Sequence, residues 1–344
     1  MTKTITSFFL ALLSFISSVF GFTSRQIFAD FSEGIYNYCP CVFEENGTRH
    51  LYYCTNTEKY NVTDHIGYRT GKAGVFGKYR YGKQTVVLSP GEAGSWDSRH
   101  VCDPTVIKGE FEYSGILYSY LMAYLGCSSD DCTENKIGLA VSRTPEGPFT
   151  KVGSAPFKDY KRETANFEWG VGQPSLINKD GHADVLLFYT KGTAARTCTV
   201  VEEWDLSNLS NPRQMSEKIL SEDGISGSDG NADCINNADF AYNRKNNEYI
   251  IVSEGHPYPT DSPDFISTYV RLTSIKATDN FENAKHTSLC TIGTAETGYK
   301  RNHNACLLRN EFGGIDSDNI KIYCSKSKTG NDSLWSYRIF EYSI

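Results

Sequence analysis

Short runs of apolar residues broken by polar turns recur along the chain, and each run has the length of a β-strand. The five clearest runs are rich in aromatic and β-branched residues, and their first positions lie 67, 67, 64 and 71 residues apart. A spacing this regular predicts repeated supersecondary units rather than an irregular fold. These runs occupy residues 51–55, 118–127, 185–190, 249–254 and 320–325.

Each run is preceded by another strand-like segment and a polar turn. The turns at 44–47 and 178–181 contain Asn, Asp and Gly, which tolerate the positive φ that hairpin turns require. Each unit is therefore predicted to contain a β-hairpin. The preceding segments occupy residues 39–43, 103–107, 173–177, 238–242 and 304–308.

A third strand follows in most units, which brings the total to at least fourteen. The third strands are expected at residues 66–70, 137–142, 199–204 and 268–272. Five similar units of three or four strands predict an all-β protein, a five-bladed β-propeller. A two-sheet sandwich is the alternative, but it would need only about seven to nine strands. The polar stretch 221–230 is expected to be a surface loop between the third and fourth units.

Residues 1–21 have the pattern of a secretory signal peptide. Lys3 supplies a basic start, an apolar run follows from residue 8 to residue 20, and small residues precede the expected cleavage before Phe22. A membrane anchor is the alternative, but a spanning helix needs ~20 apolar residues. We expect a secreted, extracellular protein, not bound to a membrane after cleavage, whose residues 22–344 form a single propeller domain.

The overall charge argues against a nucleic-acid partner. The chain carries 34 basic and 41 acidic residues, a formal net charge of −7. No broad basic field is therefore expected to hold phosphate backbones.

The protein is expected to be a monomer.

Eleven cysteines lie downstream of the expected cleavage site, where an oxidising export route permits disulfides. Cys127 and Cys132 bracket a short polar loop, and we predict that they are disulfide-bonded; the other pairings stay open. Zinc binding is the alternative, but these spacings lack a matched second pair or a His-x-x-x-His partner. We therefore expect neither a metal nor a cofactor. Four Asn-x-Ser/Thr sequons are compatible with glycosylation: Asn46, Asn61, Asn208 and Asn331.

The first strand of each propeller blade lines the central channel, so the residues that open these strands are expected to meet around one axis. The expected openings are Cys39, Asp103, Gln173, Asp239 and Asn304. Aromatic and hydrogen-bonding residues flank several of them, a combination that suits sugars. The candidate ligand-binding residues are Trp96, Arg99, His100, Trp169, Gln173, Asp239, His256 and Asn304.

Several segments resemble the arabinanase, xylosidase and invertase-like superfamily of glycoside hydrolases. The most specific is Ser-Arg-Thr-Pro-Glu-Gly-Pro-Phe at 142–149, together with Trp-Asp-Ser-Arg-His-Val-Cys-Asp-Pro from residue 96. Gly-Gln-Pro-Ser-Leu-Ile from residue 172 resembles the third blade of the same proteins. The resemblance touches all five units, and it implies the five-bladed fold and a carbohydrate ligand.

The chain departs from this superfamily where catalytic carboxylates are expected. The resemblance implies a base aspartate in the first blade, where this chain has Cys39 before Pro40. It implies a pKa-tuning aspartate in the second blade, which aligns with Asp103 or with Thr105. It implies an acid glutamate near Gly172 and Gln173, neither of which titrates. Either other carboxylates serve, or hydrolysis has been lost.

Glycoside hydrolysis needs two carboxyl groups, one protonated and one ionised. We predict Asp103, Glu168 and Glu254 as the catalytic candidates, with Glu163 and Asp239 as further carboxylates near the channel. Trp169 beside Glu168 provides an apolar neighbour of the kind that raises a carboxyl pKa. His256, close to Glu254, is expected to hold a sugar hydroxyl or a central ion.

These observations predict a secreted glycoside hydrolase that acts on a polysaccharide or oligosaccharide through carboxylates at the channel mouth. One alternative is a carbohydrate-binding propeller without catalysis, which the absence of carboxylates at Cys39 and Gln173 favours. The other is a secreted protein-interaction module, which would have no affinity for sugars.

Overall fold

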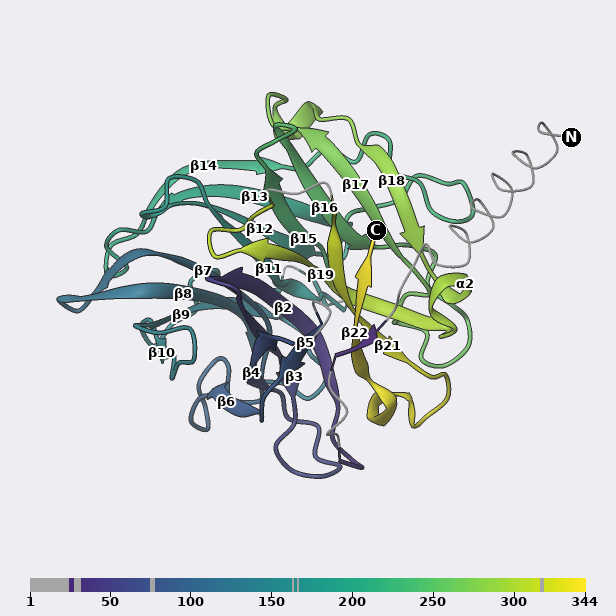
Figure 1. Cartoon of the computed structure of the whole chain (residues 1–344), viewed down its shortest axis with the longest axis horizontal. Coiled ribbons are helices and arrows are strands. Elements are labelled where there is room, and N and C mark those ends of the chain that lie inside the picture. The colour runs from purple at the N-terminus through teal and green to yellow at the C-terminus, as the bar shows by residue number, and fades with distance from the viewer. Residues whose placement is uncertain (1–24, 28–31, 75–77, 163, 166, 316–318) are drawn as a thin grey trace, which may run out of the picture.

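The computed structural model describes residues 25–27, 32–74, 78–162, 164–165, 167–315 and 319–344 (Figure 1). The expected signal segment 1–21 and the candidate Glu163 lie outside these residues. The regular secondary structure of the described chain is almost all β, as predicted, and its helical turns are short: η2 (Phe281–Asn283), α2 (Thr294–Thr297) and η3 (Ser333–Ser336). Within this part of the chain, no helix is long and apolar enough to cross a membrane.

Two four-stranded antiparallel sheets follow the order of the chain. The first contains β7 (His100–Tyr113), β8 (Ile116–Cys127), β9 (Lys136–Ser142) and β10 (Thr150–Lys151). The second contains β11 (Gly170–Asn178), β12 (Asp184–Gly192), β13 (Thr197–Asp205) and β14 (Arg213–Ile219). In Figure 1, β14, β13, β12 and β11 follow one another from the rim of the molecule toward its middle.

A third sheet repeats this arrangement and gains one strand from elsewhere in the chain. Its antiparallel part contains β15 (Asp239–Asn243), β16 (Glu248–Glu254), β17 (Val270–Lys276) and β18 (Thr287–Ile292). The short β20 (Gly314–Ile315) then pairs with β15 in parallel.

The largest sheet consists of two antiparallel groups. One contains β2 (Asn37–Glu45), β3 (Thr48–Thr55), β4 (His65–Ala73), β5 (Tyr79–Tyr81) and β6 (Thr85–Leu88). The other contains β19 (Arg301–Asn310), β21 (Lys321–Ser327), β22 (Arg338–Ser343) and β1 (Arg25–Gln26). Parallel pairing of β19 with β2 joins the groups, and pairing of β1 with β22 ties the start of the described chain to its end.

The predicted hairpins are confirmed at the level of their strands and turns. Asn46 and Gly47 link β2 to β3 with φ of 50° and 72°, the left-handed conformation that these two residue types tolerate. The sequence analysis did not identify the outer strands β6, β10, β14 and β18, which are short or exposed and therefore carry a weaker hydrophobic pattern. It also missed β22, although the apolar side chains of this strand are buried. The predicted surface loop 221–230 lies between β14 and β15.

Aromatic packing fills the space between neighbouring sheets, which explains the high aromatic content of the chain. Phe188 of β12 stacks on Phe240 of β15 with ring centroids 4.0 Å apart, and Phe281 meets Phe188 edge to face. Similar contacts join Phe43 of β2 to Tyr120 of β8. Strands far apart in the sequence are thus held around a common centre.

The strands nearest the centre begin with an unusual backbone conformation that repeats five times. Cys39, Asp103, Gln173, Asn237 and Asn304 have φ of 50°, 48°, 51°, 45° and 45°, in the left-handed region that non-glycine residues rarely adopt. Each is followed by Pro or Ala. In four of these strands the ladder skips at this residue, which is the signature of a β-bulge. The repeated bulge marks the equivalent position in each unit.

This repeat corrects one expected opening. The sequence analysis placed the fourth opening at Asp239, but the equivalent residue is Asn237, two positions earlier. The error arose because β15 begins only at Asp239, so the bulge residue lies before the strand rather than within it.

Candidate functional site

The five bulge residues lie around one narrow pocket at the centre of the molecule. The lining contains all five of them, together with the residues that follow each one. Asp103, Gln173, Asp239 and Asn304 therefore share one pocket, as predicted, whereas Arg99 and His256 are not part of its lining. We call the end of the pocket formed by the bulge residues the mouth.

Backbone N–H groups at the mouth donate from each bulge residue to a side chain of the preceding unit. Gln173 donates to the Asp103 carboxylate, and Asn237 donates to Gln173 Oε1 at 2.8 Å. Asn304 donates to Glu254 Oε1 at 3.1 Å, and Cys39 donates to Ser325 Oγ at 3.0 Å. The left-handed conformation thus provides a ring of hydrogen bonds that holds the mouth together.

Asp103 is a buried carboxyl group with a strongly shifted pKa. Burial, together with the charges of Asp64 and Glu254, raises the pKa of Asp103 to about 7, although the Cys39 thiol and the Gln173 N–H oppose the shift. Cys39 Sγ donates to Asp103 Oδ1 at 2.8 Å. A carboxyl with this pKa is available as a proton donor near neutral pH.

Glu254, at the end of β16, is a second buried carboxyl group; it lies behind Asn237 and Asn304 of the mouth and does not itself line the pocket. Burial raises its pKa, while hydrogen bonds from the Asn304 backbone, the Asn237 side chain and the Tyr258 hydroxyl favour its charged form. The Tyr258 hydroxyl donates to Oε2 at 3.1 Å. Both oxygens of Glu254 therefore accept hydrogen bonds.

Cys39 occupies the bulge position where the superfamily resemblance implied a base. Burial raises the pKa of its thiol far above the usual range, and the neighbouring Asp103 charge adds to the shift. The residue is a neutral hydrogen-bond donor rather than a nucleophile under these conditions. A disulfide between Cys54 and Cys102, with Cα atoms 5.2 Å apart, links β3 to β7 directly behind it.

Asp239 lines the pocket two residues after the bulge residue Asn237, and its contacts there are structural. Its Oδ1 is 3.0 Å from Arg309 Nη1, and its Oδ2 accepts from the Leu307 backbone N–H. Arg309 is 2% exposed and also donates to Leu176 O, Phe240 O and Thr105 Oγ1. This ion pair ties together strands of four units. Asp239 is therefore saturated by protein groups.

Glu168, a predicted catalytic residue, does not line the pocket. It is fully buried, and its carboxylate accepts hydrogen bonds from the Tyr160 hydroxyl and from Thr164. Tyr160 belongs to the apolar core between the β7–β10 and β11–β14 sheets. The glutamate is thus held away from the mouth, contrary to its expected proximity to Asp103.

The two predicted tryptophans pack differently. Trp169 is half-buried against Cys39, the Cys54–Cys102 disulfide and Leu125, beside the mouth. Trp96 stacks on Tyr124 of β8 with ring centroids 5.8 Å apart. Trp96 therefore supports the sheet and lies outside the pocket lining.

The remaining predicted binding residues belong to ionic networks beside the mouth. Arg99 forms an ion pair with the exposed Asp130 and donates to Thr63. His100 Nδ1 lies 2.9 Å from Asp64 Oδ2.

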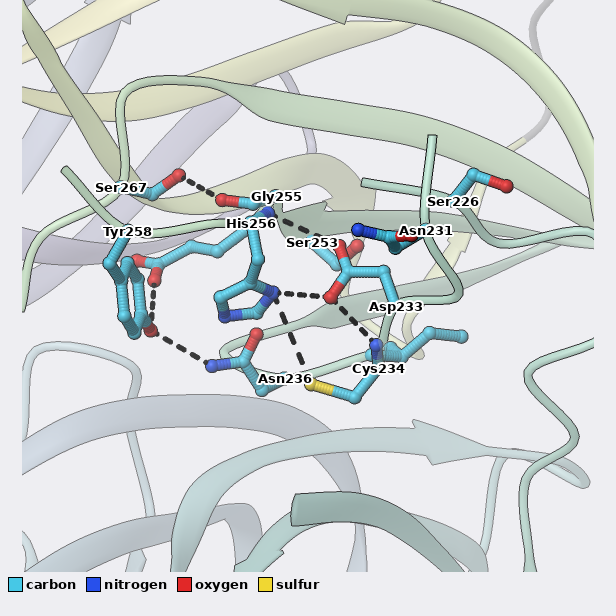
Figure 2. A network of polar contacts seen from close by, with 12 residues as sticks. Ser226, Asn231, Asp233, Cys234, Asn236, Ser253, Gly255, His256, Tyr258 and Ser267 are labelled. Atoms are coloured by element: carbon cyan, nitrogen blue, oxygen red, sulfur yellow. Dashed lines mark hydrogen bonds and ion pairs between the residues drawn. The ribbon is translucent and has the colours of Figure 1, made fainter. Parts of the chain in front are cut away.

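The network around His256 is separate from those of Arg99 and His100. His256 Nδ1 lies 2.6 Å from Asp233 Oδ1, and Figure 2 shows Asp233 between His256 and the backbone of Cys234. Arg271 lies 2.8 Å from Asp233. Burial opposes the charge on His256, but Asp233 raises its pKa to about 10.

The predicted disulfide between Cys127 and Cys132 is not present. Both residues are free thiols, and the structure instead contains the Cys54–Cys102 bond. Short spacing in sequence suggested the local pair. The observed pair is 48 residues apart and depends on strands that the fold brings together, which spacing alone does not reveal.

The sequence analysis missed several residues of the mouth. Asn237 and Tyr258 contact Glu254, and Asn237 escaped notice only because the fourth unit was read two residues out of register. Three large aromatic side chains are exposed on loops that meet the bulge end of the strands: Tyr60 (56% exposed), Phe167 (66%) and Phe265 (71%). An aromatic residue within a polar loop was the available signal.

Comparison with known proteins rests on structure alone. No family model matches the chain, and no curated protein matches it either. A family 117 glycoside hydrolase from the marine bacterium Zobellia galactanivorans is 12% identical, with a TM-score of 0.61 over 94% of this chain and 89% of that one. An α-L-arabinofuranosidase from Podospora anserina, crystallised with cellotriose, is 13% identical, with a TM-score of 0.58 over 94% and 96%.

An exo-β-1,3-galactanase from Phanerochaete chrysosporium, crystallised with β-1,3-galactotriose, is similar over a smaller share of its length. It is 16% identical, with a TM-score of 0.59 over 93% of this chain and 64% of that one. These likenesses confirm the β-propeller architecture that was predicted. The chain has the β-propeller fold shared by these glycoside hydrolases.

Proposed function

We propose that the protein is a secreted glycoside hydrolase that binds a glycan at the mouth of a five-bladed propeller and cleaves a glycosidic bond there. The five antiparallel strand groups, each with one left-handed residue at the centre, support the blade count. Exposure of all four sequons supports passage through an export route. The folds of the similar structures support a glycan as substrate.

The observation that carries the proposal is Asp103, a carboxyl in the pocket lining with a pKa of about 7. In this proposal Asp103 is the general acid that protonates the leaving oxygen, and Glu254 is its ionised partner. Burial raises the pKa of Glu254, the three donors around it oppose that shift, and its charge in turn raises the pKa of Asp103. Two carboxyls with different environments are what acid and base roles require.

The exposed aromatic residues support sugar binding on the same face. Tyr60, Phe167 and Phe265 lie on different loops around the mouth, and each presents an apolar face to solvent. Such faces pack against the C–H surface of a sugar ring while the amides of Asn237 and Asn304 suit its hydroxyls. In this proposal the loops hold the chain of sugars and the reacting bond lies over the mouth, because the pocket below it, with a volume of about 30 Å³, is too small for a sugar ring.

A second candidate function is glycan binding without hydrolysis. It is favoured by the hydrogen-bond ring, because Asp103 and Glu254 both serve as acceptors for backbone N–H groups. It is favoured also by Cys39 and Gln173, which share the backbone position of Asp103 but carry no charge. In this case the two carboxylates would hold the mouth in shape.

Parallel measurements of glycan cleavage and of sugar binding distinguish these two functions. The wild-type protein would be incubated with arabinan, xylan, fructan and fucosylated or galactosylated oligosaccharides while new reducing ends and sugar binding are recorded. Asp103→Asn is expected to lower turnover by roughly 10²- to 10⁴-fold and to leave binding largely intact. Asp184→Asn, an exposed carboxylate on β12, is the control. Undiminished release by Asp103→Asn would remove Asp103 from the mechanism, and binding without release would favour the second function.

A further inference from the structure

Three groups of metal-ligating side chains occur among the described residues, and they differ in how many ligand atoms are still available. In the first, Cys39, Cys54, Cys102 and Asp103, two sulfurs are consumed by the disulfide. In the second, Asp233, Cys234 and His256, the carboxylate already binds Arg271 and the imidazole. The third, His100, Cys127 and Cys132, has none of these restrictions.

The His100 group is assembled by strand pairing and a short loop. His100 at the start of β7 pairs with Cys127 at the end of β8. Cys132 returns from the following loop with φ of 51°, and Asn135 Nδ2 donates to its carbonyl at 2.7 Å. A ring nitrogen of His100 and the two sulfurs all lie within 4.8 Å of one another.

The imidazole of His100 is oriented as a metal ligand would be. Its Nδ1 lies 2.9 Å from Asp64 Oδ2 and 3.2 Å from the Asp64 backbone nitrogen, and the shorter contact, to a carboxylate, assigns the proton to Nδ1. The other Asp64 oxygen accepts from the Tyr36 hydroxyl at 2.7 Å. A carboxylate on one imidazole nitrogen, with the other nitrogen left as a lone pair, is the usual arrangement behind zinc-bound histidine.

The second ring nitrogen is not satisfied by the protein. His100 is 2% exposed, and its Nε2 is buried without a hydrogen-bond partner among the described residues. A buried nitrogen of this kind is costly unless something binds it. The two neighbouring sulfurs are free thiols rather than a disulfide.

We propose that His100, Cys127 and Cys132 bind one zinc ion beside the mouth, with Asp64 orienting the imidazole. One nitrogen and two sulfurs are a ligand set that zinc prefers, and two sulfurs ~2.3 Å from a tetrahedral ion lie roughly 3.8 Å apart. Small side-chain movements within the 4.8 Å cluster meet that geometry. The fourth position is left for water or a ligand oxygen. The ion fastens the 128–135 loop to β7 and is independent of the proposed hydrolysis.

The absence of this site from the sequence analysis has a simple cause. The search for zinc spacing looked for a second pair of ligands close in sequence, whereas His100 lies 27 positions before Cys127. Only the antiparallel pairing of β7 with β8 makes them neighbours.

Metal content and cysteine state test the proposal together. The full chain would be produced through an export route, purified without chelators and analysed for zinc, with Co²⁺ substitution as a spectroscopic probe of thiolate ligands. About one zinc per chain is expected, with an absorption band from Co²⁺–thiolate charge transfer. Cys127→Ser and Cys132→Ser should each lower zinc affinity by more than about 100-fold, and Cys234→Ser, from the second group, should not change it.

Two results would overturn the site. One is zinc-free protein whose peptide map under non-reducing conditions shows Cys127 joined to Cys132. The other is zinc that both serine variants retain at wild-type affinity. Asp64→Asn keeps all three ligands and therefore covers the case in which the serine variants do not fold; it should weaken Zn²⁺ binding by roughly 10- to 100-fold.

Discussion

Two histidine–aspartate pairs flank the mouth, and they have different chemistry because of the groups behind them. The His100 cluster consists of Asp64, His100, Cys127 and Cys132, and a neutral tyrosine hydroxyl satisfies its aspartate. The His256 cluster consists of Asp233, Cys234, His256 and Arg271, and a guanidinium satisfies its aspartate. Both aspartates are buried, so each needs a partner.

The difference shows how one motif acquires two roles. In the His256 cluster, Arg271 and a charged imidazole neutralise Asp233, so the cluster is an ionic anchor for the 220–238 loop (Figure 2). In the His100 cluster no guanidinium of the described residues forms an ion pair with Asp64, and the second imidazole nitrogen is buried without a hydrogen-bond partner among these residues. Each cluster stands next to one buried carboxyl, Asp103 or Glu254. The following predictions test that difference between the two clusters.

The largest expected effect is on catalysis, and it concerns Glu254, the buried carboxyl next to the His256 cluster. Glu254→Gln should lower turnover by roughly 10²- to 10⁴-fold if this residue is the ionised partner. The Glu254 charge raises the pKa of Asp103, so its removal should lower that pKa below 7. The residual activity should therefore decline at a lower pH than in wild type, because Asp103 is deprotonated there. The measurement is the pH dependence of turnover in wild type and variant.

The control for this comparison is Glu248→Gln, at the opposite end of the same strand β16, where Lys276 is the partner. It should leave both turnover and its pH dependence unchanged. An alkaline limb that stays near pH 7 in Glu254→Gln would show that the two carboxyls do not communicate.

The next effect concerns the ionic anchor. Arg271→Met leaves Asp233 buried with only His256 and frees carbonyls of Ser226, Cys234 and Glu254, so we expect a loss of roughly 3–5 kcal/mol in the free energy of unfolding. Urea unfolding measures it. Arg99→Met on the other side breaks a more exposed pair and should cost less than about 1 kcal/mol. Equal losses in the two variants would contradict the contrast.

A smaller effect separates the two aspartates. Asp64→Asn should weaken zinc binding by roughly 10- to 100-fold, while Asp233→Asn should leave zinc binding unchanged and destabilise the protein instead. Zinc competition with a chromophoric chelator gives the affinity of each variant. If Asp233→Asn also lost zinc, the ion would belong to the His256 cluster.

The last effect is the pH dependence of stability. The pKa of His256 is about 10 in the folded protein and ~6.5 when unfolded, so its contribution is complete below pH ~6.5 and is lost as pH rises toward 10. The pKa of Asp233 is about 2, so its contribution is present above pH ~4 and is lost as pH falls toward 2. The difference in unfolding free energy between wild type and His256→Gln should therefore shrink from pH 6.5 to 10. A constant difference would mean that His256 is neutral when folded.

Much of the fold was readable because strands and turns are local features. Short apolar runs and turns such as Asn46–Gly47 predicted the hairpins, and the repeat of their spacing predicted their assembly. Asp103, Gln173 and Asn304 were placed at the centre because each begins an inner strand. The bulge conformation was not predicted, since its hydrogen bonds come from the neighbouring unit.

The parts that sequence did not reveal depend on contacts between distant segments. Glu168 resembled a catalytic acid because Trp169 follows it, but Tyr160 and Thr164 satisfy it elsewhere. Arg309 carried no signal as a single charge in a strand, although it ties strands of four units together through Asp239. The Cys54–Cys102 bond likewise needs two strands that only the fold aligns.

The most direct test of the central claim is a crystal structure of the Asp103→Asn variant with an oligosaccharide that the wild type binds. The account predicts a sugar ring at the mouth, with a glycosidic oxygen within hydrogen-bond distance of the side-chain amide introduced by the substitution and with an aromatic loop residue against a neighbouring unit. Sugar bound elsewhere on the molecule, with the mouth closed by its own hydrogen-bond ring, would contradict it.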